Sequence, residues 1–253
     1  MSYVRPSGRV LGLRIDRVDY DEAVDAVLAA ADERRALRVA AANVHLVMEA
    51  RDDATLAELL DRFELVVPDG QPLRWVLNAT GDAKLADRVY GPELMRRTAA
   101  RAAADRVPVF LYGATSGVLA ALSKELVRAN PGLEIAGTRA PGFGDALFRD
   151  ADEDVSHIRA SGAGIVFVGL GCPRQERWIG LHGIAVGVPC LAVGAAFDLL
   201  AGVKRMAPPM LQRNGLEWAY RLATEPKRTW RRYLVHNPRF LVGALRDVWR
   251  RSS

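Results

Sequence analysis

The chain has 253 residues, of which 50% are hydrophobic and 26% are charged, a composition that excludes intrinsic disorder and is typical of a globular protein with a sizeable core. Its two cysteines, Cys172 and Cys190, are too few for a disulfide framework and indicate a reducing compartment. The net charge of +5 is uneven: residues 204–253 carry twelve basic and three acidic side chains, whereas residues 1–203 carry 23 basic and 27 acidic ones. We therefore expect an α/β body at 1–203 and a basic helical appendage at 204–253.

No segment has the pattern of a signal peptide or a bilayer-spanning helix. The N-terminal stretch Met1–Ile15 alternates arginines with apolar residues and lacks a continuous apolar region. The longest apolar stretch, Ile184–Val203, is interrupted by Pro189, three glycines and Asp198, which predicts a buried strand and a turn. We expect a cytoplasmic protein that binds a membrane only at its surface.

Along the body, short apolar runs alternate with segments of helical periodicity. This alternation predicts a Rossmann-like α/β fold, with a mostly parallel sheet covered by helices on both faces. The predicted strands are Val10–Ile15, Arg38–Ala42, Leu65–Val67, Pro108–Tyr112, Glu134–Ala136, Gly164–Val168 and Pro189–Val193. The predicted helices are Asp21–Glu33, Val44–Leu60, Gly70–Asn78, Pro92–Ala104, Ser116–Ala129, Asp150–Ala160 and Pro173–Leu181. Ligands of such sheets bind beyond the carboxyl ends of the strands, so chemistry is expected there.

Two glycine-rich turns follow predicted strands and lead into helices. Gly113 and Ala114 belong to the first turn, and Gly169 and Gly171 belong to the second. Such turns let backbone N–H groups approach an anion at a helix N-terminus, although glycines also serve ordinary turns. Together the two turns favour a nucleotide or sugar-phosphate ligand.

Asp69 follows a strand, after Pro68 and before Gly70, and is the carboxylate singled out by its position. An acid held at the sheet edge can act as a general base. The alternative is a helix N-cap, which Asp also forms well. Arg88 can balance this carboxylate or bind an anion, or it can be a surface arginine.

The second glycine-rich turn ends in Gln175 and Glu176, in the first turn of a predicted helix. These side chains can orient the hydroxyl groups of a ligand. For Glu176, the alternative is a favourable interaction with the helix dipole.

Several common functional motifs are missing or incomplete. Arg174 stands where a dinucleotide-binding fingerprint needs its third glycine, and neither a P-loop nor a nucleophile elbow is found. The acidic run Asp150–Asp154 fits a helix start better than a metal site. A zinc site is not expected, because the two cysteines and four histidines show no ligand spacing; the histidines are His45, His157, His182 and His236.

The basic appendage mixes arginines with three of the five tryptophans, Trp218, Trp230 and Trp249. This mixture suits an anionic lipid surface, the phosphates of a ligand, or nucleic acid. A solvated helix face is the simpler alternative. If the appendage binds the phosphates of a ligand, the candidate cations are Arg221, Arg228, Arg231 and Arg232.

Taken together, several segments resemble the WecG/TagA/CpsF glycosyltransferase family (glycosyltransferase family 26), over roughly residues 10–235. The run 169–176, of the form G-x-G-x-P-R-Q-E, with an Ala-Pro pair and G-L-E-W downstream, is specific to that family. The matching segments are 43–47, 67–70, 88–94, 110–114, 130–131, 142–143, 169–176, 193–198, 207–209, 215–218, 221–222 and 225–228.

The resemblance implies an inverting, metal-independent enzyme without a cofactor. It implies transfer of an N-acetylmannosamine-type sugar or a hexose from a UDP-sugar to a polyprenyl-pyrophosphate-linked saccharide, in the synthesis of a cell-envelope polysaccharide or a teichoic-acid-type polymer. It further implies a peripheral location at the inner face of the cell membrane, with the appendage closing over the active site.

The resemblance also assigns roles to single residues. It places the base on Asp69, and further site residues on Asn43, Arg88 and Gln175. The acid of the G-x-x-F-D segment falls on Asp198, as a uracil or ribose contact. The chain departs from the family at Ala41, where threonine is common, so its donor or acceptor can differ.

Two other classes of function stay open at this point. One is a nucleotide-sugar-binding module without catalysis, which requires a sealed Asp69. The other is nucleic-acid binding through the basic appendage, which we do not expect. The sequence leaves the oligomeric state open, and a homo-oligomer is compatible with it.

Overall fold

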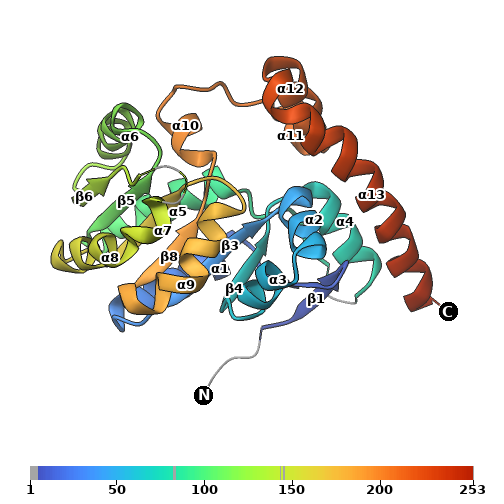
Figure 1. Ribbon diagram of the computed structural model, residues 1–253, viewed down its shortest axis with the longest axis horizontal. Helices are drawn as coiled ribbons and strands as arrows, with labels where there is room; N and C mark the ends of the chain where they lie inside the picture. The colour runs from blue at the N-terminus through green and yellow to red at the C-terminus, as the bar shows by residue number, and fades with distance from the viewer. Residues whose placement is uncertain (1–4, 82–83, 143, 145, 253) are drawn as a thin grey trace.

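The computed structural model describes residues 5–81, 84–142, 144 and 146–252, and within them the centre is a six-stranded parallel sheet (Figure 1). The strand order is β4-β3-β8-β7-β5-β6, and every neighbouring pair is parallel. The strands are β3 (Leu37–Ala42), β4 (Leu65–Pro68), β5 (Val109–Gly113), β6 (Ile135–Arg139), β7 (Ile165–Gly169) and β8 (Pro189–Ala192). The predicted α/β class is confirmed.

Helices cover both faces of the sheet because the strand residues alternate between two buried hydrophobic clusters. In β3, for example, Val39 and Ala41 face one cluster, and Ala40 and Ala42 face the other. The first face is covered by α1 (Tyr20–Asp32), α5 (Gly91–Ala104), α6 (Ser116–Ala129) and α10 (Ala196–Leu200). The second is covered by α2 (Val44–Asp52), α3 (Ala54–Asp61), α4 (Gln71–Ala79), α7 (Ala146–Arg149), α8 (Ala151–Ala160) and α9 (Arg174–Val186).

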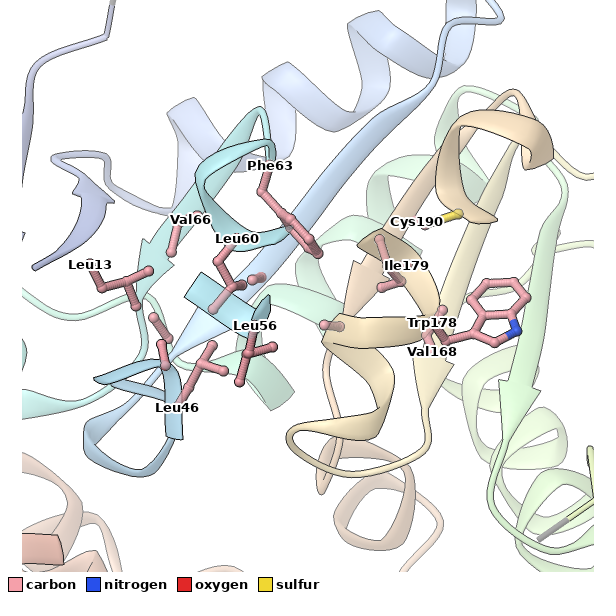
Figure 2. Close-up of a cluster of buried hydrophobic side chains, with 14 of the residues drawn as sticks. Leu13, Leu46, Leu56, Leu60, Phe63, Val66, Val168, Trp178, Ile179 and Cys190 are labelled. Atoms are coloured by element: carbon pink, nitrogen blue, oxygen red, sulfur yellow. The ribbon is translucent and has the colours of Figure 1, made fainter. Parts of the chain in front are cut away.

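Figure 2 shows part of the second cluster, to which Leu46 of α2, Leu56 of α3 and Ile179 of α9 all contribute. The ring centroids of Trp178 and Tyr112 are 4.4 Å apart, which joins α9 to β5. Tight packing of this kind fixes the positions of the strand ends, from which the site is built.

The predicted strand Val10–Ile15 is wrong. The segment forms a separate antiparallel hairpin of β1 (Ser7–Val10) and β2 (Leu13–Asp16). Leu11 and Gly12 make the turn with positive φ angles of 49° and 96°. Two-residue hairpin turns need this backbone conformation, and a Leu-Gly pair is a weak signal for it compared with Asn-Gly.

The predicted helix Val44–Leu60 is two helices, because Asp53 leaves the helical conformation with a ψ of 101°. Its side chain accepts a hydrogen bond of 3.1 Å from the backbone N–H of Leu56 and so caps α3. Of the sequence segments discussed above, residues 1–4, Phe143 and residue 253 lie outside the described residues.

The C-terminal part is helical, as predicted, with α11 (Pro209–Arg213), α12 (Glu217–Thr224) and α13 (Pro226–Ser252). The 27 residues of α13 span about 40 Å, and the helix runs along α2 and α4 (Figure 1). Phe240 and Ala244 of α13 are buried in the second cluster, and Asp247 accepts a hydrogen bond of 2.9 Å from the backbone of Leu11. The domain boundary at 203/204 stays a prediction. None of the helices in the described ranges is both long and apolar enough to cross a bilayer.

Candidate active site

A polar cavity and an apolar groove meet at the carboxyl ends of β3 and β4. The polar cavity, of about 690 Å³, is lined by the ends of β3, β4 and β8, the first turn of α9, and side chains that include Glu49, Arg174 and Arg239. The apolar groove, of about 470 Å³, lies between α4, α12 and α13. Its apolar side chains include Trp75, Leu216, Trp218, Leu234 and Leu241. The residues that line both are Asn43, His45, Asp69, Tyr90 and Arg221.

Asp69 is held by the backbone on both sides of its carboxylate. Its N–H donates a 2.8 Å hydrogen bond to the carbonyl of Ala42, which continues the β3–β4 pairing beyond the strand end. Its Oδ1 atom accepts a 3.0 Å bond from the N–H of Gly91 at the start of α5. Asp69 does not cap α4, because Gly70 is the N-cap there and makes no side-chain cap bond. The carboxylate is therefore oriented, and it lines both spaces.

The surroundings of Asp69 make its carboxyl group more basic than usual. Burial raises its pKa above the ordinary 3.8, and the nearby Glu217 raises it further. Arg88, the Gly91 N–H and the Asn43 amide lower it, but burial prevails. A raised pKa is suited to a group that accepts a proton near neutral pH.

Asn43 connects this carboxylate to α2. Its Oδ1 atom caps α2 by accepting bonds from the N–H groups of His45 (3.1 Å) and Leu46 (3.3 Å). This leaves its Nδ2 group to donate a 3.3 Å bond to Oδ2 of Asp69. Because the cap fixes which end of the amide faces Asp69, Asn43 is a donor to that carboxylate.

Glu217 at the start of α12 gathers three side chains around one buried carboxylate. Arg88 donates a 2.9 Å hydrogen bond to its Oε2 atom, and Tyr90 donates one of 2.9 Å to Oε1. Arg221 also donates to Oε1, and it lies 3.3 Å from the hydroxyl of Tyr90. The guanidinium of Arg88 lies 4.2 Å from the centre of the Tyr90 ring and donates to the main-chain carbonyl of Asp69 at 3.3 Å. The ion-pair partner of Arg88 is thus Glu217.

Charge within this group decides its protonation. Burial alone would raise the pKa of Glu217, but Arg221 and Arg88 lower it below its ordinary 4.5. Burial also opposes the charge of Arg221, yet the neighbouring Glu217 holds the pKa of Arg221 above its usual range. Burial and the neighbouring Glu217 raise the pKa of Tyr90, which stays a neutral donor. At neutral pH the group holds two cations and one anion.

The second glycine-rich turn reaches the polar cavity. Gly171, Gln175 and Glu176 all line it. Gln175 accepts a 3.1 Å bond from the N–H of Gly171 and donates one of 2.8 Å to Glu176, so both side chains are held in place. The positive φ of 79° at Gly171 favours glycine.

The first glycine-rich turn serves packing. A side-chain carbon on Gly113 would lie 2.6 Å from the carbonyl group of Gly169, and one on Gly169 would lie 2.6 Å from the ring of Phe197. The N–H of Ala114 donates a 3.0 Å bond to the carbonyl of Gly169. The described residues that line the two spaces do not include Gly113, Ala114 or Gly169. In the sheet order, β5 lies beyond β7, away from β3 and β4.

The remaining candidates are scattered. Asp198 pairs with Lys204 at 2.8 Å, and it is absent from the described lining of both spaces. Ala41 lines the polar cavity. The side chains of three arginines on α13 lie outside the described part of the structure: Arg228, Arg231 and Arg232.

The sequence analysis did not single out two features of the site. Glu217 is one of only three acidic residues after residue 203, and that isolation in a basic segment was the available signal. The other group is His45, Glu49 and His236, whose ligand-type atoms lie within 4.8 Å of one another. No sequence spacing revealed it, because α2 and α13 contribute separately.

Comparisons with known proteins agree with these observations. Residues 8–253 match the family described as Glycosyl transferase WecG/TagA/CpsF. Over 221 residues, the chain is 32% identical to N-acetylglucosaminyldiphosphoundecaprenol N-acetyl-beta-D-mannosaminyltransferase of Bacillus spizizenii. The alignment covers 85% of this chain and 81% of that relative.

Proposed function

Because this chain belongs to the WecG/TagA/CpsF family of glycosyl transferases, we propose that it moves N-acetylmannosamine, or a related hexose, from a UDP-sugar to a saccharide on a polyprenyl diphosphate. The name of the Bacillus spizizenii relative supports a GlcNAc-diphosphate-lipid as the acceptor. The product would serve the synthesis of a cell-envelope polymer.

The observation that carries this proposal is the position of Asp69 between two chemically different spaces. The polar cavity offers arginines and a helix N-terminus, which suit a nucleoside diphosphate. The apolar groove offers tryptophan and leucine side chains, which suit a hydrocarbon chain. A module that only binds a nucleotide sugar would not need a carboxylate with a raised pKa where the two spaces meet.

The proposed reaction is a direct displacement with Asp69 as general base. The acceptor hydroxyl attacks the anomeric carbon of the donor, and a new C–O bond forms as the bond from that carbon to UDP breaks. The hydroxyl proton passes to Asp69, and the bonding electrons leave with UDP. Attack from the side opposite UDP inverts the anomeric configuration. Asn43 would hold the carboxylate in the orientation that accepts the proton.

UDP departs with growing negative charge, which needs stabilisation where the bond breaks. Arg221 lines both spaces, and Arg174 with the first turn of α9 lines the polar cavity. We assign the leaving diphosphate to these groups, with Gln175 and Glu176 facing the sugar or ribose hydroxyls. No step in this scheme passes through a metal ion or a cofactor.

The exposed face of α13 is the proposed membrane contact. Its large apolar side chains at Leu245 and Trp249 are 71% and 73% exposed, and Leu241 and Val242 are also exposed. The same helix is rich in arginine. Apolar side chains combined with arginines favour an anionic lipid surface, from which a lipid-linked acceptor can enter the apolar groove.

The decisive experiment supplies a short-chain polyprenyl-diphosphate-GlcNAc with a panel of UDP-sugars, and measures UDP release and the glycosylated lipid. Transfer from one UDP-sugar by the wild type, and its loss in Asp69→Asn with UDP binding retained, would support the proposal. An Asp69→Asn variant that turns over at the wild-type rate would refute the base. Binding to DNA in preference to anionic vesicles would favour the nucleic-acid alternative.

A further inference from the structure

His45, Glu49 and His236 form a compact cluster between two helices that are far apart in the sequence. His45 and Glu49 lie one turn apart on α2, with His45 Nδ1 3.5 Å from Glu49 Oε1. His236 projects from α13, with its Nε2 atom 3.7 Å from the same carboxylate oxygen. The two imidazole rings are 5.3 Å apart and are tilted by 60°. Three side chains that commonly bind metals therefore converge from opposite sides of the helix interface.

The donor set and its dimensions suit zinc. Two imidazoles and one carboxylate are common zinc ligands, at bond lengths that place ligand atoms roughly 3.3 Å apart around a tetrahedral ion. The atoms of this cluster lie within 4.8 Å of one another. Small side-chain rotations would bring them onto one ion without moving the helices.

The local charge also favours a cation. Arg239 of α13 makes two hydrogen bonds of 2.7 and 2.6 Å to Asp52, which lies about one turn beyond Glu49. Arg239 is thus paired with Asp52, and the carboxylate of Glu49 faces the two histidines. The packing of Phe240 and Ala244 in the second cluster holds α13 on the body, which preorganises the three ligands.

We propose that His45, Glu49 and His236 bind one Zn²⁺ ion, which ties α13 to α2 and so fastens the C-terminal helix to the α/β body. All three residues line the polar cavity, so the fourth coordination position opens towards it and takes a water molecule. The ion has a structural role, and the assignment is independent of the glycosyl transfer proposed above.

The test is direct metal binding by the full-length chain, purified without a histidine tag and stripped with a chelator. Isothermal titration with Zn²⁺ alone should give one site per chain, and Co²⁺ should give the visible absorption bands of a tetrahedral complex. His236→Ala and Glu49→Gln should each weaken Zn²⁺ binding at least about tenfold, since even ligand-supporting residues contribute that much. His157→Ala, which removes an exposed histidine elsewhere, should bind as the wild type does.

Hydrogen exchange gives a second readout that needs no variant. Saturating Zn²⁺ should slow exchange of the α13 amides around His236 and leave those of α6 unchanged. The proposal is overturned if the wild type binds no stoichiometric Zn²⁺, or if His236→Ala binds it with unchanged affinity. It is also overturned if zinc leaves exchange in α13 unaltered.

Discussion

The Nη2 atom of Arg88 lies 2.9 Å from the Oε2 atom of Glu217, although the two residues are 129 positions apart. Both side chains are largely buried, with exposed fractions of 10% and 12%. The pair joins the segment before α5 to the C-terminal helices, and it lies beside Asp69. It therefore connects stability with the proposed chemistry.

Glu217→Gln should destabilise the protein. The substitution leaves the guanidiniums of Arg88 and Arg221 enclosed without the carboxylate to which both donate, a loss of about 3 kcal/mol in the free energy of unfolding. The melting temperature should fall by roughly 6–12 °C in a chain of this size, as measured by calorimetry. Glu125→Gln, which breaks the exposed pair with Arg128, is the control and should leave the melting temperature nearly unchanged. Equal effects of the two substitutions would contradict the arrangement.

The same pair predicts a pH dependence of stability. The folded-state pKa of Glu217 is below its ordinary 4.5, so its contribution is present above that pH and is lost as the pH falls through the folded value. The difference in unfolding free energy between the wild type and Glu217→Gln should therefore shrink below pH 4.5. Denaturant titrations of both proteins between about pH 7 and about pH 3.5 measure this difference. A difference that grows on acidification would reverse the assigned sign.

Asp69→Asn should abolish transfer without harming the fold. Loss of a general base lowers kcat by about 10²–10⁴-fold, while UDP affinity stays close to the wild-type value. The folded-state pKa of Asp69 is raised, so its charge at neutral pH opposes folding and its removal should not lower the melting temperature. Asp105→Asn, at an exposed pair with Arg101, should retain full activity. A cold-labile or unfolded Asp69→Asn protein would point to a structural role instead.

Activity should depend on pH through Asp69. The base must be unprotonated, so kcat/KM should fall on the acid side with a midpoint above the ordinary 3.8 of an aspartate. The measurement is a series of initial rates under conditions in which the donor is far below saturation. In Asp69→Asn the residual rate should lack this acid limb. If the rate of Asp69→Asn still falls on the acid side, that fall belongs to another titrating group.

The apolar groove predicts a selective effect on the acceptor. Leu241→Asp places a charge among groove-lining side chains, of which Leu241 is 59% exposed. The KM for a polyprenyl acceptor should rise at least about tenfold, since one charge there opposes burial of several methylene groups. The KM for the UDP-sugar should stay constant. An equal rise in both KM values would contradict binding of the acceptor in the groove.

Membrane docking is tested apart from catalysis. Trp249→Ser with Leu245→Ser removes two exposed apolar side chains from α13 and should reduce flotation with anionic vesicles several-fold. Transfer to a water-soluble, short-chain acceptor should persist. Trp75→Ser, a half-exposed tryptophan on α4, provides a control for the loss of surface tryptophan in vesicle binding. Unchanged flotation of the double variant would contradict a membrane contact through α13.

Some candidate residues chosen from the sequence line the polar cavity because they stand at strand ends. Asn43, Asp69 and Gly171 stand just after parallel strands, and the carboxyl ends of such strands share one edge. Gly113 and Ala114 meet the same criterion, but β5 is separated from β3 by β7 and β8. Strand order depends on packing across the whole body, so local patterns could not distinguish the two glycine-rich turns.

Contacts made by the C-terminal helices were beyond prediction for a related reason. Glu217 contacts Arg88, and His236 contacts Glu49, only because α12 and α13 pack on the body. The basic composition predicted an appendage that contacts anions. It gave no indication that a buried carboxylate within the appendage would neutralise the arginines around it.

Under the proposed function, Glu217 would make donor capture an exchange of anions. Arg221 already has a resident carboxylate, so the diphosphate that we propose it binds would have to displace a group that remains attached to the protein. In the proposed reaction the displaced carboxylate would stay close by and compete for the guanidinium of Arg221. On this proposal Glu217 would regain its partner as UDP leaves, and tight retention of UDP would be disfavoured by a side chain of the protein itself.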